Sequence, residues 1–171
     1  MSSPERDFIP LRFAVLTVSD TRDLASDSSG GLLEQELGAA GHVCHERIVV
    51  KDEVEAIRAK VQSWCATEGV QVILVTGGTG VTARDVTPEA LEPLYDKALS
   101  GFGELFRMLS WEDIGAATIQ SRASAGVIDG RLVFVLPGST GACRLAVEKI
   151  LLSQLDARTR PCSFAGLIDR L

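Results

Sequence analysis

The chain has 171 residues, which fits one domain with a sizeable core, and its 46% hydrophobic and 23% charged residues are ordinary globular composition. Its 17 basic and 23 acidic residues give a net charge of −6, which argues against nucleic acid as the main partner. The charged first ten residues lack a signal-peptide core, and no apolar run approaches the roughly 20 residues of a membrane span. We therefore expect a cytoplasmic protein with no membrane partner. Residues 1–10 are expected to form a disordered or extended arm, and residues 11–171 a single domain with a C-terminal tail from about residue 156.

Cysteine and histidine spacing does not suggest a metal site. The four cysteines lie far apart without a C-x-x-C pair, which leaves zinc ribbons and thioredoxin-type motifs unsupported; they are Cys44, Cys65, Cys143 and Cys162. We expect buried free thiols. His42 and His45 flank a cysteine, but the stretch His42–Val50 has the pattern of a strand, which would point the two rings to opposite faces.

Strands and helices alternate along the first half of the chain. The nearly continuous apolar run Phe13–Val18 predicts a central strand, and a helix follows from about Gly30 to Ala40. After the expected strand His42–Val50, Asp52 and Glu55 resemble a capping box. The helix that they begin carries apolar residues at helical spacing, namely Val54, Ile57, Val61 and Trp64.

A second buried strand is expected over Val70–Val75, followed by a helix with Thr87 as its N-cap and Pro88 as its first residue. The next helix spans Gly101–Trp111. One stripe of it, expected to be core or subunit contact, holds Phe102, Leu105, Phe106 and Leu109, whereas Glu104, Arg107 and Ser110 are candidates for a polar pocket wall.

The turn pair Asp129–Gly130 predicts a hairpin between strands at Ala125–Ile128 and Leu132–Leu136. A helix from about Gly141 to Leu155 completes a second strand-loop-helix unit. The expected fold is α/β: a three-layer, doubly wound, mostly parallel sheet with one antiparallel hairpin strand and helices on both faces.

Three strand ends are small and polar, at Ser19–Asp20, Thr76–Gly80 and Pro137–Thr140. In an open α/β sheet, ligands bind beyond the carboxyl ends of the strands, so these ends should converge on one site. The glycines let backbone N–H groups turn toward an anion, and Arg84 and Asp85 could face it. The alternative is that the small residues only make tight turns.

Common phosphate and hydrolase motifs do not fit. A Walker loop requires Gly-Lys-Ser/Thr, but Val81 follows Gly80. The third glycine of a dinucleotide fingerprint falls on Ala83. No G-x-S-x-G elbow is present, and neither histidine sits at an expected strand end. These absences disfavour common ATPase, dehydrogenase and serine-hydrolase chemistry.

The string Gly77-Gly78-Thr79-Gly80, with Arg84 through Ala90 after it, resembles the signature of the molybdopterin-binding family, which includes MogA, MoaB and the G domain of gephyrin. Further matches cover nearly the whole chain: Val18-Ser19-Asp20, the Asp52 segment, Gly101-Phe102-Gly103-Glu104, Gln120-Ser121-Arg122 and Leu136-Pro137-Gly138-Ser139. The segments at 100–109, 137–144 and 154–162 look most like the MoaB branch.

This resemblance implies a trimer or a dimer of trimers that binds molybdopterin, and Mg²⁺ with ATP in active relatives. The implied reaction is adenylylation of the molybdopterin phosphate, with release of pyrophosphate. Asp85 and Asp52 would be the catalytic acids, and Asp85 would also hold Mg²⁺. The implied substrate-binding residues are Ser19, Asp20, Thr76, Gly77, Gly78, Thr79, Gly80, Arg84, Glu104, Arg122, Pro137, Gly138 and Ser139.

Two alternatives stay open. The first is a non-catalytic oligomer that carries molybdopterin or binds a purine nucleotide. It is favoured by the cation supply, because only Arg84, Arg107, Arg122 and Arg144 lie near the candidate loops and Thr140-Gly141 stands where some relatives have a lysine. The second is a purely structural oligomer. The sequence leaves open ATP or GTP, molybdenum or tungsten, and three or six subunits.

Overall fold

The computed structural model describes residues 6–171. Residues 1–5 of the expected arm lie outside this range, and residues 6–10 form neither helix nor strand. The ring of Phe8 packs at 5.2 Å, centroid to centroid, against the buried ring of His42. His42 also accepts a hydrogen bond from the Leu11 N–H at Nδ1, 3.1 Å away. These contacts attach the end of the arm to the domain.

One six-stranded sheet forms the centre of the molecule, in the order β2-β1-β3-β6-β5-β4. The strands are β1 (Arg12–Val18), β2 (Val43–Val50), β3 (Val72–Thr76), β4 (Lys97–Ala98), β5 (Ser124–Ile128) and β6 (Arg131–Leu136). β2, β1, β3 and β6 pair in parallel, whereas β5 is antiparallel to both of its neighbours. The predicted mostly parallel sheet with one antiparallel hairpin strand is therefore confirmed.

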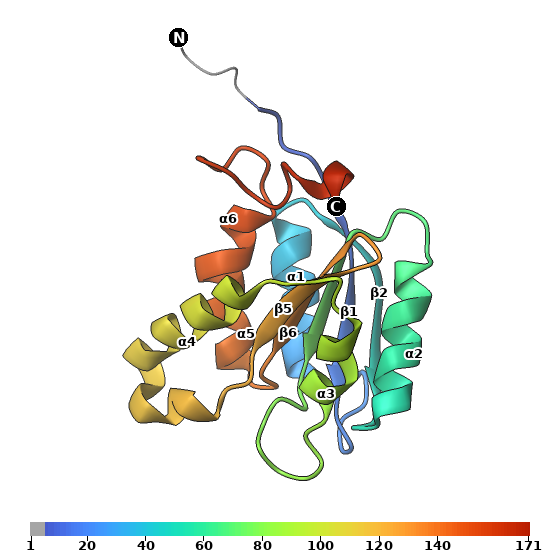
Figure 1. Cartoon of the computed structure of the whole chain (residues 1–171), viewed down its shortest axis with the longest axis vertical. Coiled ribbons are helices and arrows are strands. Elements are labelled where there is room, and N and C mark those ends of the chain that lie inside the picture. Colours follow the sequence, from blue (N-terminus) through green and yellow to red (C-terminus); the bar gives the residue numbers. More distant parts are fainter. Residues whose placement is uncertain (1–5) are drawn as a thin grey trace.

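Helices cover both faces of this sheet (Figure 1). The α-helices are α1 (Ser28–Ala39), α2 (Val54–Cys65), α3 (Thr87–Leu91), α4 (Ser100–Ile114), α5 (Thr140–Ala146) and α6 (Leu152–Gln154). Short 3-10 helices are η1 (Glu92–Leu94), η2 (Gly115–Gln120) and η4 (Ile168–Arg170), and η3 (Val147–Leu151) is a π-helix. No helix within residues 6–171 is long and apolar enough to cross a membrane.

The core has two halves because successive residues of each strand face opposite sides of the sheet. Phe13 and Val15 of β1 pack in the cluster that includes residues of α1, α4 and α5. Ala14 and Leu16 alternate with these residues along β1. They pack in the cluster that includes residues of α2 and α3. The continuous apolar strands identified in the sequence are thus buried on both faces, and the three-layer architecture is confirmed.

Helix starts differ from the sequence predictions. α1 begins at Ser28 because the Asp27 carboxylate caps it and accepts from the Gly30 N–H at 2.9 Å. The capping box of Asp52 is wrong, since α2 begins at Val54 and its N-cap, Glu53, makes no side-chain cap bond.

Thr87 is also not an N-cap. It lies within α3, whose N-cap is Val86, and its side chain makes a tertiary contact described below.

Other predictions differ in extent. On the α4 stripe, which was expected to be core or subunit contact, Phe102 and Phe106 are core, and Leu105 is 38% exposed, so subunit contact stays the prediction for Leu105. Among the cysteines, Cys65 and Cys143 are buried and Cys44 is half-buried, but Cys162 is exposed, so the expectation of buried thiols is wrong there. The long helix predicted after Gly141 is divided by the π-helix η3.

Candidate functional site

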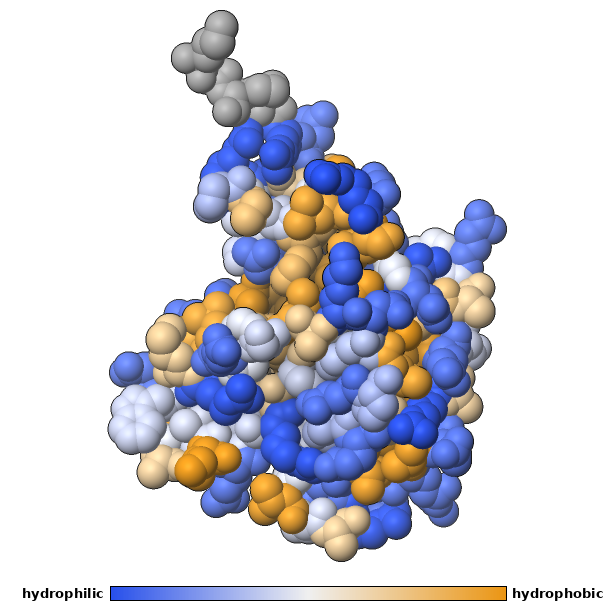
Figure 2. Space-filling view, viewed as in Figure 1, coloured by the Kyte–Doolittle hydropathy of each residue, from blue (hydrophilic) through white to orange (hydrophobic). Residues whose placement is uncertain are grey.

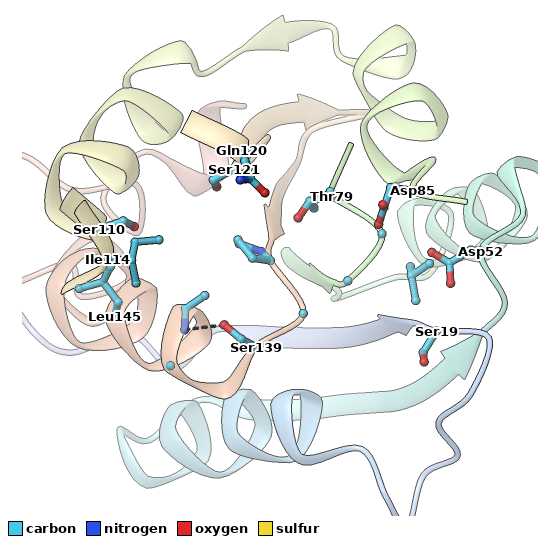
Figure 3. A pocket seen from close by; sticks show the side chains of 18 of the residues that line it. Ser19, Asp52, Thr79, Asp85, Ser110, Ile114, Gln120, Ser121, Ser139 and Leu145 are labelled. Carbon is cyan, nitrogen blue, oxygen red and sulfur yellow. Dashed lines mark hydrogen bonds between the residues drawn. The ribbon is translucent and has the colours of Figure 1, made fainter. Parts of the chain in front are cut away.

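A cavity of about 790 Å³ opens at the carboxyl ends of β1, β3 and β6 (Figure 3). Because these strands are parallel neighbours, the loops that follow them meet at one edge of the sheet. The sequence-predicted residues on its wall are Ser19, Asp20, Asp52, Gly77, Gly78, Thr79, Gly80, Asp85, Pro137, Gly138 and Ser139. The three polar strand ends therefore do converge.

Glycine is required where the loop after β3 passes between its neighbours. Gly77 and Gly78 have φ angles of 100° and 64°, which side chains rarely adopt. A Cβ at Gly77 would lie 2.2 Å from the Val18 carbonyl oxygen, and one at Gly78 would lie 2.3 Å from Thr87 Oγ1. The same Thr87 hydroxyl donates a 2.8 Å hydrogen bond to the Gly77 carbonyl. The loop is thus held against the sheet edge by a buried threonine.

Two carboxylates flank this loop. Cβ atoms built at Gly78 and Gly80 would lie 2.9 Å from Asp52 Oδ1 and 2.8 Å from Asp85 Oδ2. In Figure 3 both acids lie on the side of the cavity that carries Thr79. We call Asp52 and Asp85 the acid pair.

The two acids have different surroundings. Asp85 Oδ2 accepts from the N–H of Thr82 at 3.0 Å and from its hydroxyl at 2.5 Å, and these bonds lower the pKa of Asp85. The Asp52 carboxylate accepts no hydrogen bond from residues 6–171. Burial, followed by the charges of Asp20 and Asp85, raises the pKa of Asp52. The acid pair thus leaves carboxylate oxygens without protein partners at the cavity wall.

Asp20 is paired with Arg84. The guanidinium donates from Nε and Nη2 to the two carboxylate oxygens, both at 2.8 Å, and this pairing lowers the pKa of Asp20. The Asp52 N–H also donates to Asp20 Oδ1 at 3.2 Å. Arg84 does not line the cavity itself, so its charge is directed toward Asp20.

Arg122 holds the glycine loop from behind. It donates to the Gly80 carbonyl at 2.9 Å and to the Asp85 carbonyl at 3.0 Å, and it pairs with Glu89. It does not line the cavity. Its observed contacts therefore position the loop rather than face a ligand.

Two further sequence-predicted residues lie away from the cavity wall. Thr76 is fully buried and donates its hydroxyl to the Pro137 carbonyl at 2.9 Å, which ties the β3 loop to the β6 loop. Glu104 is exposed on α4 and lines a different cavity, of about 700 Å³, together with Tyr95 and Arg107.

The opposite wall is formed by α4 and α5. Ser110, Ile114 and Leu145 lie together on that side in Figure 3, and Phe106 also lines the cavity. Ser110 is a candidate from the sequence, whereas Ile114 lies beyond the predicted end of the helix. This partly apolar wall, facing polar loops, has the mixed character of a small-molecule site.

Some wall residues were not identified as candidates in the sequence, and the polar ones among them are Thr21, Arg22, Asp113, Gln120 and Ser121. Gln120 and Ser121 adjoin Arg122 within a stretch that resembles the family. Arg22 lies in an irregular loop between β1 and α1, where no periodicity points to a site. Only the folded arrangement brings it to the cavity.

The acid pair could take part in binding a magnesium ion. Carboxylate oxygens suit Mg²⁺, which usually binds one or two carboxylates together with substrate phosphates and water. Residues 6–171 contain no group of three or more metal-ligating acids, histidines or cysteines. The donor set therefore fits a cation shared with a phosphate ligand better than a site made by protein alone.

A family model described as "Probable molybdopterin binding domain" matches residues 14–157, and the chain belongs to this family. It is 54% identical over 164 residues to molybdenum cofactor biosynthesis protein B of Escherichia coli strain K12, covering 96% of both chains. It is 49% identical to the Bacillus subtilis strain 168 protein of the same name, over 146 residues, 85% of this chain and 86% of the other.

Solved structures agree with this assignment. A crystal structure of molybdenum cofactor biosynthesis protein B matches with a TM-score of 0.85 and 46% identity, covering 88% of this chain and 94% of the other. The tungsten cofactor synthesizing protein MoaB from Pyrococcus furiosus matches with a TM-score of 0.74 and 40% identity, covering 83% and 91%. The resemblance to the MoaB branch that was inferred from sequence motifs is confirmed.

Proposed function

We propose that this protein acts in molybdenum cofactor biosynthesis, in the cytoplasm, by binding molybdopterin and transferring the adenylyl group of ATP to its phosphate. The observation that carries the proposal is the acid pair next to Gly78 and Gly80 of the glycine loop, at the carboxyl edge of the sheet. Family membership and the similarity to proteins named for cofactor biosynthesis support the choice of ligand.

The proposed reaction joins two anions. An oxygen of the molybdopterin phosphate forms a bond to the α-phosphorus of ATP, the bond from that phosphorus to the bridging oxygen of the β-phosphate breaks, and pyrophosphate leaves. Such a step depends mainly on positioning and charge neutralisation. When bound, Mg²⁺ would neutralise phosphate charge.

The residues of the chain supply the positioning. Asp52 and Asp85 would hold the cation through the oxygens that have no protein partner, and Thr82 keeps the Asp85 side chain in place. No described residue accepts from the N–H groups of Gly78 and Thr79, which leaves them able to donate to a phosphate. The wall of Ile114 and Leu145 offers a surface for the pterin.

Pyrophosphate release tests the proposal. Wild-type protein given molybdopterin, ATP and Mg²⁺ should release pyrophosphate, and Asp85→Asn should lower the rate by about 10²–10³-fold, the usual loss when a group that stabilises transition-state charge is removed. Asp169→Asn, an exposed site in η4, is the matched control and should keep full activity. Full activity of Asp85→Asn would refute the role of Asp85.

A second candidate is a non-catalytic carrier of molybdopterin or of a purine nucleotide. The observation in its favour is the small number of cations at the cavity wall, where Arg22 is the only basic residue among the described ones. Arg84 is paired with Asp20, Arg122 is bound to loop carbonyls, and no lysine among the described residues lines the cavity. Saturable binding of molybdopterin without pyrophosphate release would favour this carrier.

We also propose that the chain assembles as a trimer or a dimer of trimers. Apolar side chains on the outside of α4 and η2 support self-association, because Met108 is 62% exposed, Trp111 58% and Ile119 84%. Ile114, which is 54% exposed, belongs to the same helix and also lines the cavity. An assembled neighbour would therefore lie near the ligand site.

A further inference from the structure

Arg22 is the only basic side chain among the described residues that line the cavity, whereas four aspartates line it: Asp20, Asp52, Asp85 and Asp113. Its backbone N–H donates to Ser19 Oγ at 3.1 Å. Its side chain reaches the loop after β6, where Nη1 donates to the Gly138 carbonyl at 3.1 Å. The guanidinium thus spans the first and last of the three strand ends that form the site.

A buried network fixes the orientation of this guanidinium. Nη1 also donates to Ser29 Oγ at 3.0 Å, and the Ser29 hydroxyl donates to Asp27 Oδ1 at 3.4 Å. The Asp27 side chain has no exposed surface and is held by Arg47 and by Thr17, both at 2.9 Å. Because each partner is itself held, Arg22 is oriented before any ligand arrives.

Two nitrogens of Arg22 have no acceptor. Only Nη1 is engaged within residues 6–171, and Nε and Nη2 donate to no described residue. Together Nε and Nη2 form the planar pair of donors that matches two oxygens of one phosphate. The opposite arrangement is seen at Arg84, where the same two nitrogens are already bound to Asp20.

This cation and the acid pair line the same cavity but belong to loops that lead to helices on opposite faces of the sheet. Arg22 contacts Ser29 of α1, a helix of the cluster that also includes α4 and α5, whereas Asp52 and Asp85 belong to the loops that lead into α2 and α3. An isolated phosphate gains attraction beside Arg22 and meets repulsion beside the acids. The two sides of the cavity therefore suit two different groups.

We propose that Arg22 binds the phosphate of the pterin ligand through Nε and Nη2 and so determines the preference of the site for the phosphorylated pterin. This inference rests on the proposed function. It places the phosphate of the pterin, which is the nucleophile, on the side of the cavity next to α1. The side of the cavity next to the acid pair is then left for the cation and the nucleotide. The two phosphate groups then meet over the glycine loop.

Fluorescence titration with the stable oxidised derivative of molybdopterin, compared with the same compound after removal of its phosphate, tests this assignment. Wild-type protein should bind the phosphorylated compound at least tenfold more tightly. Arg22→Gln should weaken that binding by about 10–100-fold, as expected for charge-assisted hydrogen bonds, and leave binding of the dephosphorylated compound unchanged. Arg22→Lys should give an intermediate loss, because it keeps the charge without the paired donors.

Ser29→Ala keeps the guanidinium but removes one of its hydrogen-bond acceptors. It should therefore lower the affinity for the phosphorylated compound by a few-fold and leave the affinity for the dephosphorylated compound unchanged. Arg12→Gln, an exposed site at the opposite end of β1, is the matched control and should change neither affinity. Equal affinity of wild-type protein for the two compounds, or an equal loss for both in Arg22→Gln, would overturn the role of Arg22 while leaving molybdopterin binding intact. Binding of neither compound to wild-type protein would instead overturn the proposed function.

Discussion

Asp52 differs from its neighbours Asp20 and Asp85 because its carboxylate accepts no hydrogen bond from the described residues. The sequence offered capping as an ordinary reason for an aspartate at this position, and the start of α2 at Val54 removes that reason. Burying a charge without a partner lowers stability. Its position beside Gly78 is consistent with a binding role that costs the protein stability.

Asp52→Asn should therefore make the protein more stable at neutral pH. A raised pKa means that the folded state binds the proton more tightly than the unfolded state. Below the ordinary value of 3.8 both states are protonated and the aspartate has no effect. As pH rises through the raised pKa, wild-type stability falls, and the loss persists at pH 7. Because the group is partly solvated, the gain should be a few tenths of a kcal/mol, or roughly 1 °C in Tm.

Thermal unfolding of wild type and Asp52→Asn between pH 3.5 and 8 measures this effect. The difference in Tm should grow from near zero at the acid end to its full value at neutral pH. Asp169→Asn, at an exposed position, is the control for the substitution itself. A variant less stable than wild type at pH 7 would show that Asp52 is a structural residue.

At the scale of elements, the glycine loop depends on a contact from the helix that follows it. Thr87 is fully buried in α3, and its hydroxyl satisfies the Gly77 carbonyl. Its N–H in turn donates to the Gly78 carbonyl at 2.9 Å. These two hydrogen bonds link the loop after β3 to α3 at the site.

Thr87→Val keeps the side-chain shape but leaves the Gly77 carbonyl without its buried donor. It should lower the free energy of unfolding by about 1–3 kcal/mol and weaken ligand binding. Denaturant unfolding together with ligand titration measures both effects. Thr67→Val, whose exposed hydroxyl bonds to the Ser63 carbonyl, should change stability by less than about 0.5 kcal/mol. Equal losses in the two variants would show that the loop does not depend on Thr87.

Elements encoded by adjacent residues could be predicted from the sequence, whereas elements that depend on tertiary contacts could not. Buried parallel strands and the turn at Asp129–Gly130 are encoded locally, so their positions could be predicted. The bond from Thr87 to the Gly77 carbonyl links elements through the tertiary fold, and the local Thr-Pro-Glu pattern suggested a cap instead. β4 has two residues and no pattern to detect.

The residues of the candidate site also fall into those that a local pattern predicts and those that only tertiary contacts place there. Gly77 and Gly78, which have positive φ, stand in one recognisable string with Asp85, so the loop and Asp85 could be predicted. Arg22 reaches the site only because β1 and β6 both flank β3. The positions of Thr76 and Arg122 behind the loop are likewise set by tertiary hydrogen bonds that no sequence period reports.

At the scale of the whole molecule, the candidate site at the carboxyl ends of β1, β3 and β6 lies at the end opposite the described part of the N-terminal arm and the C-terminal segment (Figure 1). Figure 2 shows a band of hydrophobic side chains on the face of the molecule that is viewed in Figure 1. The band runs from the region of α4 toward the C-terminal segment. Exposed Leu105, Met108 and Leu167 are among the large apolar residues of these elements. Such a surface suits contact between copies of the chain.

Sedimentation equilibrium should give a mass three or six times the 18.3 kDa of one chain. The double substitution Met108→Glu and Trp111→Glu places charges in the proposed contact and should lower that mass. Replacing the exposed Val81 with Glu, away from α4, is the control for added charge and should leave the assembly unchanged. A monomeric wild type would contradict the proposed assembly.

A crystal structure of the protein with molybdopterin, ATP and Mg²⁺ tests the central claim most directly, because it locates the ligands. We expect the pterin and the nucleotide in the cavity between Gly78 and Ser139, with the metal ion bound by Asp85. Ligands bound instead in the cavity lined by Tyr95 and Glu104, or outside both, would contradict the account.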